Sequence, residues 1–370
     1  MRYYLIAGER SGDLHASNLM KALQNIDSEA QFRFFGGEHM QATGGTLVRH
    51  YREMAVMGFW EVLKNLPKIA ALLKFCKKDI LAYQPDAVIL VDFAGFNMQI
   101  AKFCKQNRIK NFYYISPKIW AWNTKRAWKI KQNVDRMFVI FPFEKDFYKQ
   151  FDYEVDFVGN PLLDAIQNFQ KDDNFFEKNA LSTQKPIIAL LPGSRRAEVE
   201  NMLSLMLQIK PHFPHFQWIV AGVDNLPKNL YRVCQEADVP VLFNQTYDLL
   251  ANAHSAVVTS GTATLETALF GVPQVVCYKT SYISYQIAKR LIKVPFISLV
   301  NLIMNKKVVT ELIQNDLNEQ NLKAELLKIV EGQERKQIME DYQLLKEKMG
   351  TAGASEVAAE KMFAYLNKPL

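Results

Sequence analysis

The sequence predicts an α/β protein with two Rossmann-like domains, each a doubly wound parallel sheet, followed by a helical C-terminal tail. Short apolar runs alternate with amphipathic stretches, which is typical of a parallel sheet covered by helices on both faces. The alternation breaks at Gly159-Asn160-Pro161 and in the polar stretch 171–184, and then it restarts. At 370 residues the chain is also long for one hydrophobic core.

Each half of the chain supplies its own set of predicted strands. In the first half they are 3–7, 32–35, 87–91, 111–115 and 136–141, with the main helices at 14–23, 67–83 and 96–106. In the second half they are 187–191, 218–221, 241–243, 256–258 and 274–277. After residue 318 the pattern is helical and charged. We therefore predict a first domain at 1–165, completed by tail helices within 340–370, and a second at 166–339, with a linker at 171–184.

Composition and net charge exclude some classes of protein and indicate the kind of partner to expect. Hydrophobic residues make up 49% of the chain, which excludes a disordered protein, and 45 basic against 38 acidic residues give a net charge of +7. That excess favours an anionic partner: a phosphorylated substrate, nucleic acid or an acidic membrane surface. The four cysteines are scattered and the histidines form no HExxH pattern, so we predict no metal site and no disulfide framework. Without a signal peptide or a run of about 20 apolar residues, we expect a cytoplasmic protein.

The motif TSGTATLE, at 259–266, predicts a phosphate site. It follows a short apolar strand and opens a helix, so unpaired backbone N–H groups and the helix dipole meet at Ser260, Gly261 and Thr262. Glu266 lies one turn further on, where its carboxylate can accept hydrogen bonds from a ribose. A diphosphate site beside such a carboxylate suits a nucleotide sugar. An ordinary strand–turn–helix joint with a solvated Glu is the alternative.

A second strand-end turn reads LPGSRRAE, at 191–198. Gly193 and Ser194 form a tight turn, and Arg195 stands at the start of the next helix. A guanidinium is suited to bidentate pairing with phosphate, so we assign these three residues to the same anion site. The alternative is an Arg that is merely solvated.

The first half offers carboxylates and a histidine at its strand ends. GERSGDLH, at 8–15, follows the first strand and contributes Glu9 and His15, with Asp13 expected to cap the next helix. Asp92 follows the apolar run 87–91. Partial desolvation there raises the pKa of a carboxyl and suits it to accept a proton from a substrate hydroxyl. A helix N-cap is the alternative for Asp92, and a plain capped turn is the alternative for the first loop.

Two stretches combine aromatic and basic residues. The apolar stretch 55–73 is accompanied or followed by lysines, which fits either a membrane-surface element or ordinary core packing. The stretch 114–131 holds three tryptophans among Lys and Arg. It fits either stacking of single-stranded nucleic acid bases or a pocket for a phosphorylated amphiphile.

Together these motifs resemble the lipid-A-disaccharide synthase family. The resemblance runs nearly end to end, through GERSGDLH, AVMGFWEVL, ISPKIWAW, PFEKDFY, VGNPLLD, LPGSRRAEVE, TSGTATLE and ISLVNLI. It implies an inverting glycosyltransferase of the GT-B fold that needs no metal or other cofactor. The implied reaction joins UDP-2,3-diacylglucosamine to 2,3-diacylglucosamine 1-phosphate, which gives a β-1,6 disaccharide and UDP.

The resemblance also assigns roles to residues. Asp92 matches a candidate base for the acceptor 6-hydroxyl, and Glu9 matches the first-loop Glu; His15 is a third catalytic candidate. Arg195, Glu266 and Asn301 match donor-site positions. Two departures are Arg10, where the family usually has Ala, and Gly95, where it often has a second Asp. Since Gly95 cannot act as a base, we place the chemistry on Asp92.

The resemblance favours membrane contact over core packing for the stretch 55–73. The residues expected to enter the headgroup region are Val56, Met57, Phe59, Trp60 and Leu63. The predicted partners are the two lipid sugars and the cytoplasmic face of the inner membrane, with no nucleic acid and with a homodimer left open. Two rival functions are another UDP-sugar enzyme of this fold, such as a UDP-GlcNAc 2-epimerase, and a non-enzymatic nucleic-acid binder.

Overall fold

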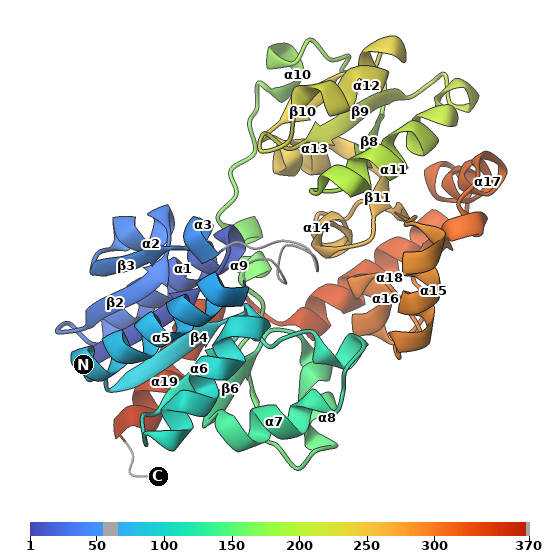
Figure 1. The fold of residues 1–370 in the computed structure, drawn as a ribbon. Helices are drawn as coiled ribbons and strands as arrows, with labels where there is room; N and C mark the ends of the chain where they lie inside the picture. Colours follow the sequence, from blue (N-terminus) through green and yellow to red (C-terminus); the bar gives the residue numbers. More distant parts are fainter. Residues whose placement is uncertain (55–65, 368–370) are drawn as a thin grey trace. The chain divides into compact units, whose positions relative to one another are not determined.

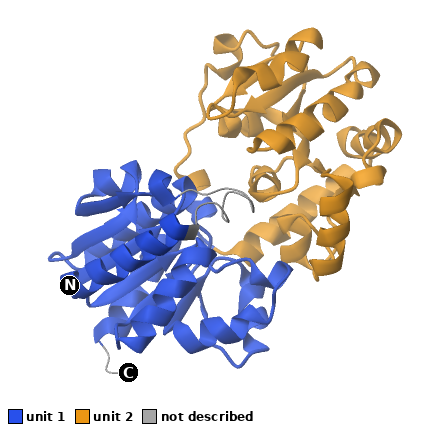
Figure 2. Ribbon diagram, in the orientation of Figure 1, with its two compact units in different colours: residues 1–164, 351–370 blue, residues 165–350 orange. Residues whose placement is uncertain are grey.

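The computed structural model describes residues 1–54 and 66–367 and divides into two compact units (Figure 1, Figure 2). Unit 1 comprises Met1–Asp164 and Thr351–Leu370, and unit 2 comprises Ala165–Gly350. Each unit holds one parallel sheet with helices packed on it, which confirms the predicted pair of Rossmann-like sheets and the helical tail.

Unit 1 contains a seven-stranded sheet in the order β3-β2-β1-β4-β5-β6-β7. Its strands are β1 (Arg2–Ala7), β2 (Gln31–Gly36), β3 (Thr46–His50), β4 (Ala87–Val91), β5 (Asn111–Tyr114), β6 (Arg136–Val139) and β7 (Asp156–Phe157). The direction of winding reverses between β1 and β4, whose pairing sets Ala7 opposite Val91. The turns that follow these two strands therefore lie side by side.

Helices cover both faces of this sheet. They are α1 (Arg10–Ile26), α2 (Glu38–Thr43), α3 (Tyr51–Met54), α5 (Leu66–Tyr83), α6 (Ala94–Gln106), α7 (Arg126–Asn133), α8 (Pro142–Lys149), α9 (Pro161–Gln167) and α19 (Ala354–Asn367), with a 3₁₀ turn at Ile119–Ala121. Most of α9 belongs to unit 1, since the unit boundary falls after Asp164.

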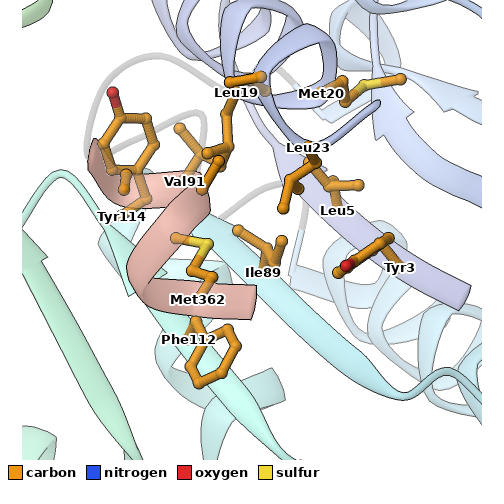
Figure 3. Close-up of a cluster of buried hydrophobic side chains, with 14 of the residues drawn as sticks. Tyr3, Leu5, Leu19, Met20, Leu23, Ile89, Val91, Phe112, Tyr114 and Met362 are labelled. Carbon is orange, nitrogen blue, oxygen red and sulfur yellow. The ribbon is translucent and has the colours of Figure 1, made fainter. Parts of the chain in front are cut away.

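Side chains alternate between the two faces along each strand, as the pleat requires. Tyr3 and Leu5 point into a cluster with α1 and α19, whereas Tyr4 and Ile6 join a cluster with α5 and α6. In Figure 3, Met362 of α19 lies with Ile89 and Phe112 of the sheet. The last helix of the chain is therefore part of the core of unit 1.

Unit 2 contains a six-stranded sheet in the order β10-β9-β8-β11-β12-β13. Its strands are β8 (Ile187–Leu191), β9 (Gln217–Gly222), β10 (Val241–Phe243), β11 (Ala253–Thr259), β12 (Gln274–Tyr278) and β13 (Thr310–Ile313). Winding reverses between β8 and β11, and Leu191 pairs with Val258 there. Unit 2 thus has its own pair of adjacent strand-end turns.

The helices of unit 2 follow its strands and continue after the last one. They are α10 (Phe175–Lys178), α11 (Arg196–Gln208), α12 (Arg232–Glu236), α13 (Thr246–Asn252), α14 (Thr262–Leu269), α15 (Tyr282–Leu291), α16 (Leu299–Met304), α17 (Glu319–Val330) and α18 (Glu334–Met349). Three 3₁₀ turns lie at Lys210–His212, Lys228–Tyr231 and Gln314–Asp316. None of the helices in the described ranges has the length and apolar character that crossing a bilayer requires.

Two local expectations need correction. The sequence pattern missed β3, β7 and β13, which all lie at sheet edges, where strands are short or carry mixed polar and apolar residues. The predicted linker 171–184 is part of unit 2: it contains α10, whose Phe175 is buried in the core cluster of that unit. The backbone N–H of Asp172 also donates to the Asp248 carboxylate, at 2.8 Å. The segment 171–184 is mostly polar, so its composition gave no sign that Phe175 is buried.

Candidate active site

Each unit has a place where the strand order reverses, and ligands of doubly wound sheets bind beside such places, at the carboxyl ends of the strands. In unit 1 the two turns are those after β1 and β4, which carry Glu9 and Asp92. In unit 2 they are those after β8 and β11, which carry Arg195 and Gly261. Most of the candidate residues thus lie at two topologically equivalent positions.

The turn after β4 has a strained and tightly held backbone. Asp92 and Phe93 have φ angles of +43° and +48°, in the left-handed region that non-glycine residues rarely adopt. The Asp92 carbonyl accepts hydrogen bonds from the Tyr113 hydroxyl at 2.5 Å and from the Asn97 amide at 2.8 Å. Strain of this kind persists where surrounding contacts enforce it and is common at functional sites. Here the contacts hold the backbone from which the Asp92 side chain projects.

The Asp92 carboxyl has altered acidity. Burial, together with the neighbouring Glu9 carboxylate, raises its pKa to about 6, while the Lys118 ammonium opposes the shift. The helix that follows begins from Phe93 as its N-cap residue, so Asp92 does not take the N-cap position considered as its alternative. A half-buried carboxyl with a pKa near 6 is ionised at neutral pH and is still basic enough to accept a proton.

The first loop places its three polar residues in different settings. Glu9 is exposed at the N-cap position of α1. Burial lowers the pKa of His15 to about 4, and its Nδ1 atom has no hydrogen-bond partner, so the ring is neutral at pH 7. Asp13 lies inside α1 instead of capping it. Its carboxylate accepts N–H groups at the N-terminus of α2, from Gly37 at 2.6 Å and His39 at 3.0 Å.

In unit 2, the turn after β11 opens helix α14. Gly261 is its N-cap residue and Thr262 its first residue, and both are exposed. The first N–H groups of a helix have no partners within it, so they can bind an anion. Ser260 fixes the turn, because its hydroxyl donates to the Ile297 carbonyl at 2.9 Å.

Glu266 is held by a residue that the sequence did not reveal. The hydroxyl of Tyr247, on α13, donates to the Glu266 carboxylate at 3.2 Å, and burial raises the pKa of Glu266. The Tyr247 ring packs against Phe169 and Phe270, with ring centroids 5.6 and 5.1 Å away. Because Tyr247 comes from another helix, no local pattern links it to Glu266.

The turn after β8 is already occupied by an internal carboxylate. Glu198, in the first turn of α11, accepts the backbone N–H groups of Ser194 at 2.9 Å and of Arg195 at 3.1 Å. Gly193 has a φ of +116°, and a Cβ there would lie 2.5 Å from a Glu198 oxygen. The Arg195 side chain is 79% exposed. This turn therefore offers an exposed guanidinium that lies 3.6 Å from the Glu198 carboxylate, while two of its amides are satisfied internally.

Asn301, which the resemblance matches to a donor-site position, lies in the interior of unit 2. Its side chain is fully buried; it donates to the Val309 carbonyl and to Glu311, and it accepts the N–H groups of Val308 and Val309. No polar atom is left to contact a ligand. Glu311 also accepts the N–H of Ile297, at 3.0 Å, so this network supports the segment to which Ser260 is bound.

The aromatic and basic stretch 114–131 presents little open stacking surface. Trp120 is buried and donates to Glu144 at 3.2 Å. Trp122 and Trp128 are exposed, but Arg126 lies over the first ring, 4.9 Å from its centroid, and Lys131 over the second, at 5.4 Å. This arrangement weakens the nucleic-acid hypothesis, because a cation of the chain itself lies over one face of each exposed ring.

Two further expectations concern metals and the membrane. Across residues 1–54 and 66–367, no three His, Cys, Asp or Glu side chains gather into a group that could bind a metal ion. The residues predicted to contact the membrane, Val56, Met57, Phe59, Trp60 and Leu63, lie outside the described residues.

Comparison with known proteins decides the family. A family model described as lipid-A-disaccharide synthetase matches residues 3–363. The chain belongs to this family. The lipid-A-disaccharide synthase of Syntrophus aciditrophicus (strain SB) is 39% identical over 98% of this chain and 97% of its own length, and that of Geobacter sulfurreducens is 35% identical over 99% and 98%. Membership confirms the prediction of a glycosyltransferase of lipid A biosynthesis.

Solved structures resemble the chain in fold. A UDP-GlcNAc 2-epimerase from Neisseria meningitidis, bound to UDP-GlcNAc, aligns with a TM-score of 0.68 at 14% identity, over 98% of this chain and 100% of its own. The calicheamicin glycosyltransferase CalG4 aligns with a TM-score of 0.64 at 15% identity, over 100% and 99%. These likenesses confirm the GT-B architecture. The epimerase alternative shares this fold, while the family match supports the synthase.

Proposed function

We propose that this member of the family transfers the 2,3-diacylglucosamine unit of UDP-2,3-diacylglucosamine to the 6-hydroxyl of 2,3-diacylglucosamine 1-phosphate. The acceptor oxygen attacks the anomeric carbon, the bond from that carbon to UDP breaks, and the anomeric configuration inverts. The observation that carries the proposal is Asp92, a fixed carboxylate beside a sheet's reversal point with a pKa of about 6.

On the acceptor side, Asp92 takes the proton of the 6-hydroxyl as the new bond forms. A positioned base contributes roughly 10²–10⁴-fold to a reaction of this kind. Glu9 keeps the Asp92 carboxyl basic through its negative charge. Glu9 and His15 are the runners-up for the base itself, because the first loop adjoins the turn of Asp92 in the sheet.

On the donor side, the start of α14 binds the diphosphate through Gly261 and Thr262. The Arg195 guanidinium pairs with the negative charge of the same diphosphate. Glu266, oriented by Tyr247, binds the ribose. Gly193 and Ser194 contribute when the phosphate replaces Glu198 at their turn, and Ser260 and Asn301 hold the neighbouring segments in place.

The leaving diphosphate needs no metal in this proposal, because a helix N-terminus and a guanidinium offset its charge. Activity is expected to survive excess EDTA. A loss of activity that added Mg²⁺ restores would contradict this point.

Both substrates carry acyl chains, so we place the reaction at the cytoplasmic face of the inner membrane, with peripheral association. The apolar residues of the stretch 55–73 remain the sequence-based prediction for that contact. Vesicle binding that weakens but persists at high salt is the expected behaviour, since lysines near anionic lipids add a screened attraction.

The decisive experiment incubates the purified protein with the two lipid sugars. Free UDP and a tetraacyl disaccharide 1-phosphate are expected in equal amounts. Conversion of UDP-GlcNAc to its 2-epimer, with no disaccharide formed, would instead establish the epimerase alternative. Tight, salt-sensitive binding of an oligonucleotide with no response to UDP would favour the nucleic-acid binder.

A further inference from the structure

Helix α15 in unit 2 differs from the other long helices of that unit. Helices α11, α14, α17 and α18 each bury several side chains, whereas α15 (Tyr282–Leu291) buries none. Its large apolar side chains are instead exposed: Tyr282 and Ile283 by 73%, Ile287 by 55% and Leu291 by 48%. Exposed apolar clusters of this kind mark interaction sites.

The exposed residues form one stripe. Ile283, Ile287 and Leu291 are spaced by four residues, so they follow one another along a single side of the helix. Ile292, just beyond the end of α15, extends the apolar surface with 40% exposure. A continuous aliphatic stripe with no partner in its own unit is suited to hydrocarbon.

The charged residues in the part of the sequence that contains the stripe have one sign, although Lys306 pairs with the Asp341 carboxylate of α18 at 2.6 Å. No Asp or Glu occurs between Glu266 and Glu311, and this interval contains only basic charged residues: Lys279, Lys289, Arg290, Lys293, Lys306 and Lys307. Lys289 and Arg290 stand in the last turn of α15, and both are exposed. Long basic side chains beside an apolar stripe can reach phosphates while the stripe enters an apolar layer.

We propose that the exposed face of α15 binds the surface of an anionic phospholipid bilayer. This contact lies in unit 2 and is separate from the membrane contact predicted for the stretch 55–73. A second copy of the chain fits less well, because a symmetric pairing of this face would bring its cations together without any carboxylate between them. Nucleic acid also fits less well, since aliphatic side chains offer no stacking platform.

A fluorescent probe at the centre of the stripe tests the contact directly. The four native cysteines are buried, so Ile287→Cys can be labelled selectively with nitrobenzoxadiazole in the full chain. Vesicles of phosphatidylglycerol and phosphatidylcholine should shift its emission to the blue. The matched control is Leu344→Cys on α18. The native Leu344 side chain is 48% exposed, and a label at this position should show no blue shift with vesicles. Vesicle-bound protein without a shift at position 287 would overturn the proposal.

Vesicle co-sedimentation measures how much the surface contributes. Ile283→Ser, Ile287→Ser and Leu291→Ser together should lower the partition coefficient at least about tenfold, and Lys289→Glu should lower it by about fivefold or more at low salt. Leu327→Ser with Leu344→Ser, an equally exposed pair elsewhere in unit 2, should leave it unchanged. Unchanged UDP affinity in all variants shows that unit 2 is folded. Normal partition in the triple variant, or dissociation of a dimer as its only effect, would overturn the proposal.

Discussion

The reversal points of the two sheets have the same topology but opposite electrostatic character. In unit 1 the adjacent turns bring two carboxylates together, and one of them, Asp92, is half-buried with a raised pKa. In unit 2 the adjacent turns present helix N–H groups and the exposed Arg195. We therefore expect the same strand order to serve proton acceptance in one unit and anion binding in the other, with the side chains at the strand ends making the difference.

The largest effect is expected where the carboxylate of unit 1 is removed. Asp92→Asn should lower kcat by about 10²–10⁴-fold, because Asn cannot accept the proton. Asn tolerates the left-handed backbone, so the turn should keep its shape. UDP affinity, measured by calorimetry, should not change.

Asp152→Asn is the matched control for Asp92→Asn. Asp152 is an exposed Asp that also has a left-handed φ, of +49°, and its substitution should leave kcat unchanged. If Asp92→Asn kept near-normal turnover while Glu9→Gln or His15→Ala lost it, the base would belong to the first loop.

A smaller effect is expected at the carboxylate of unit 2. Glu266→Ala should raise the donor KM and the Kd for UDP about 10- to 100-fold, since a hydrogen bond to a charged group is worth about 1.5–3 kcal/mol. Tyr247→Phe removes only the orienting hydroxyl and should cost less. Glu200→Ala, which removes an exposed Glu paired with Arg196, serves as the control. Unchanged UDP affinity in both Glu266→Ala and Arg195→Ala would move the donor site elsewhere.

The pH dependence should distinguish the two turns. The base must be ionised, so kcat/KM should rise with pH through about 6 and then level off. Glu9→Gln removes a neighbouring negative charge that raises the Asp92 pKa, so the midpoint should move to lower pH. Arg195→Ala should lower the plateau and leave the midpoint in place. If Glu9→Gln left the midpoint of the pH profile unchanged, the charge of Glu9 would have no effect on the pKa of Asp92 in solution.

The smallest effect is expected at Gly95, where the family often has a second Asp. A Cβ there meets no atom within 4 Å, so Gly95→Asp should fit without strain. An acidic residue near a helix N-terminus should stabilise the protein by about 0.3–1 kcal/mol, seen as a raised Tm. Turnover should stay within a few-fold if Asp92 is the base. A rise of tenfold or more would show that position 95 can carry the chemistry.

Much of the fold and part of the candidate site were predictable from local pattern. Strands 87–91 and 187–191 have the bounds expected, because a strand buried on both faces is a continuous apolar run. Edge strands such as β3 lack that signature. The strand-end rule also located the turns of Asp92 and Gly261, whereas their proposed roles remain predictions.

Contacts between distant segments were decided only by the tertiary structure. Strand order and register place Glu9 beside Asp92, and packing of α13 brings Tyr247 to Glu266. Asn301 is buried in the interior. At the start of α11, Glu198 accepts the backbone N–H groups of Ser194 and Arg195 that were expected to bind phosphate. Periodicity along a chain records which face of an element is buried. It does not record which other element covers that face, and the pKa of a carboxyl and the availability of an amide depend on that neighbour.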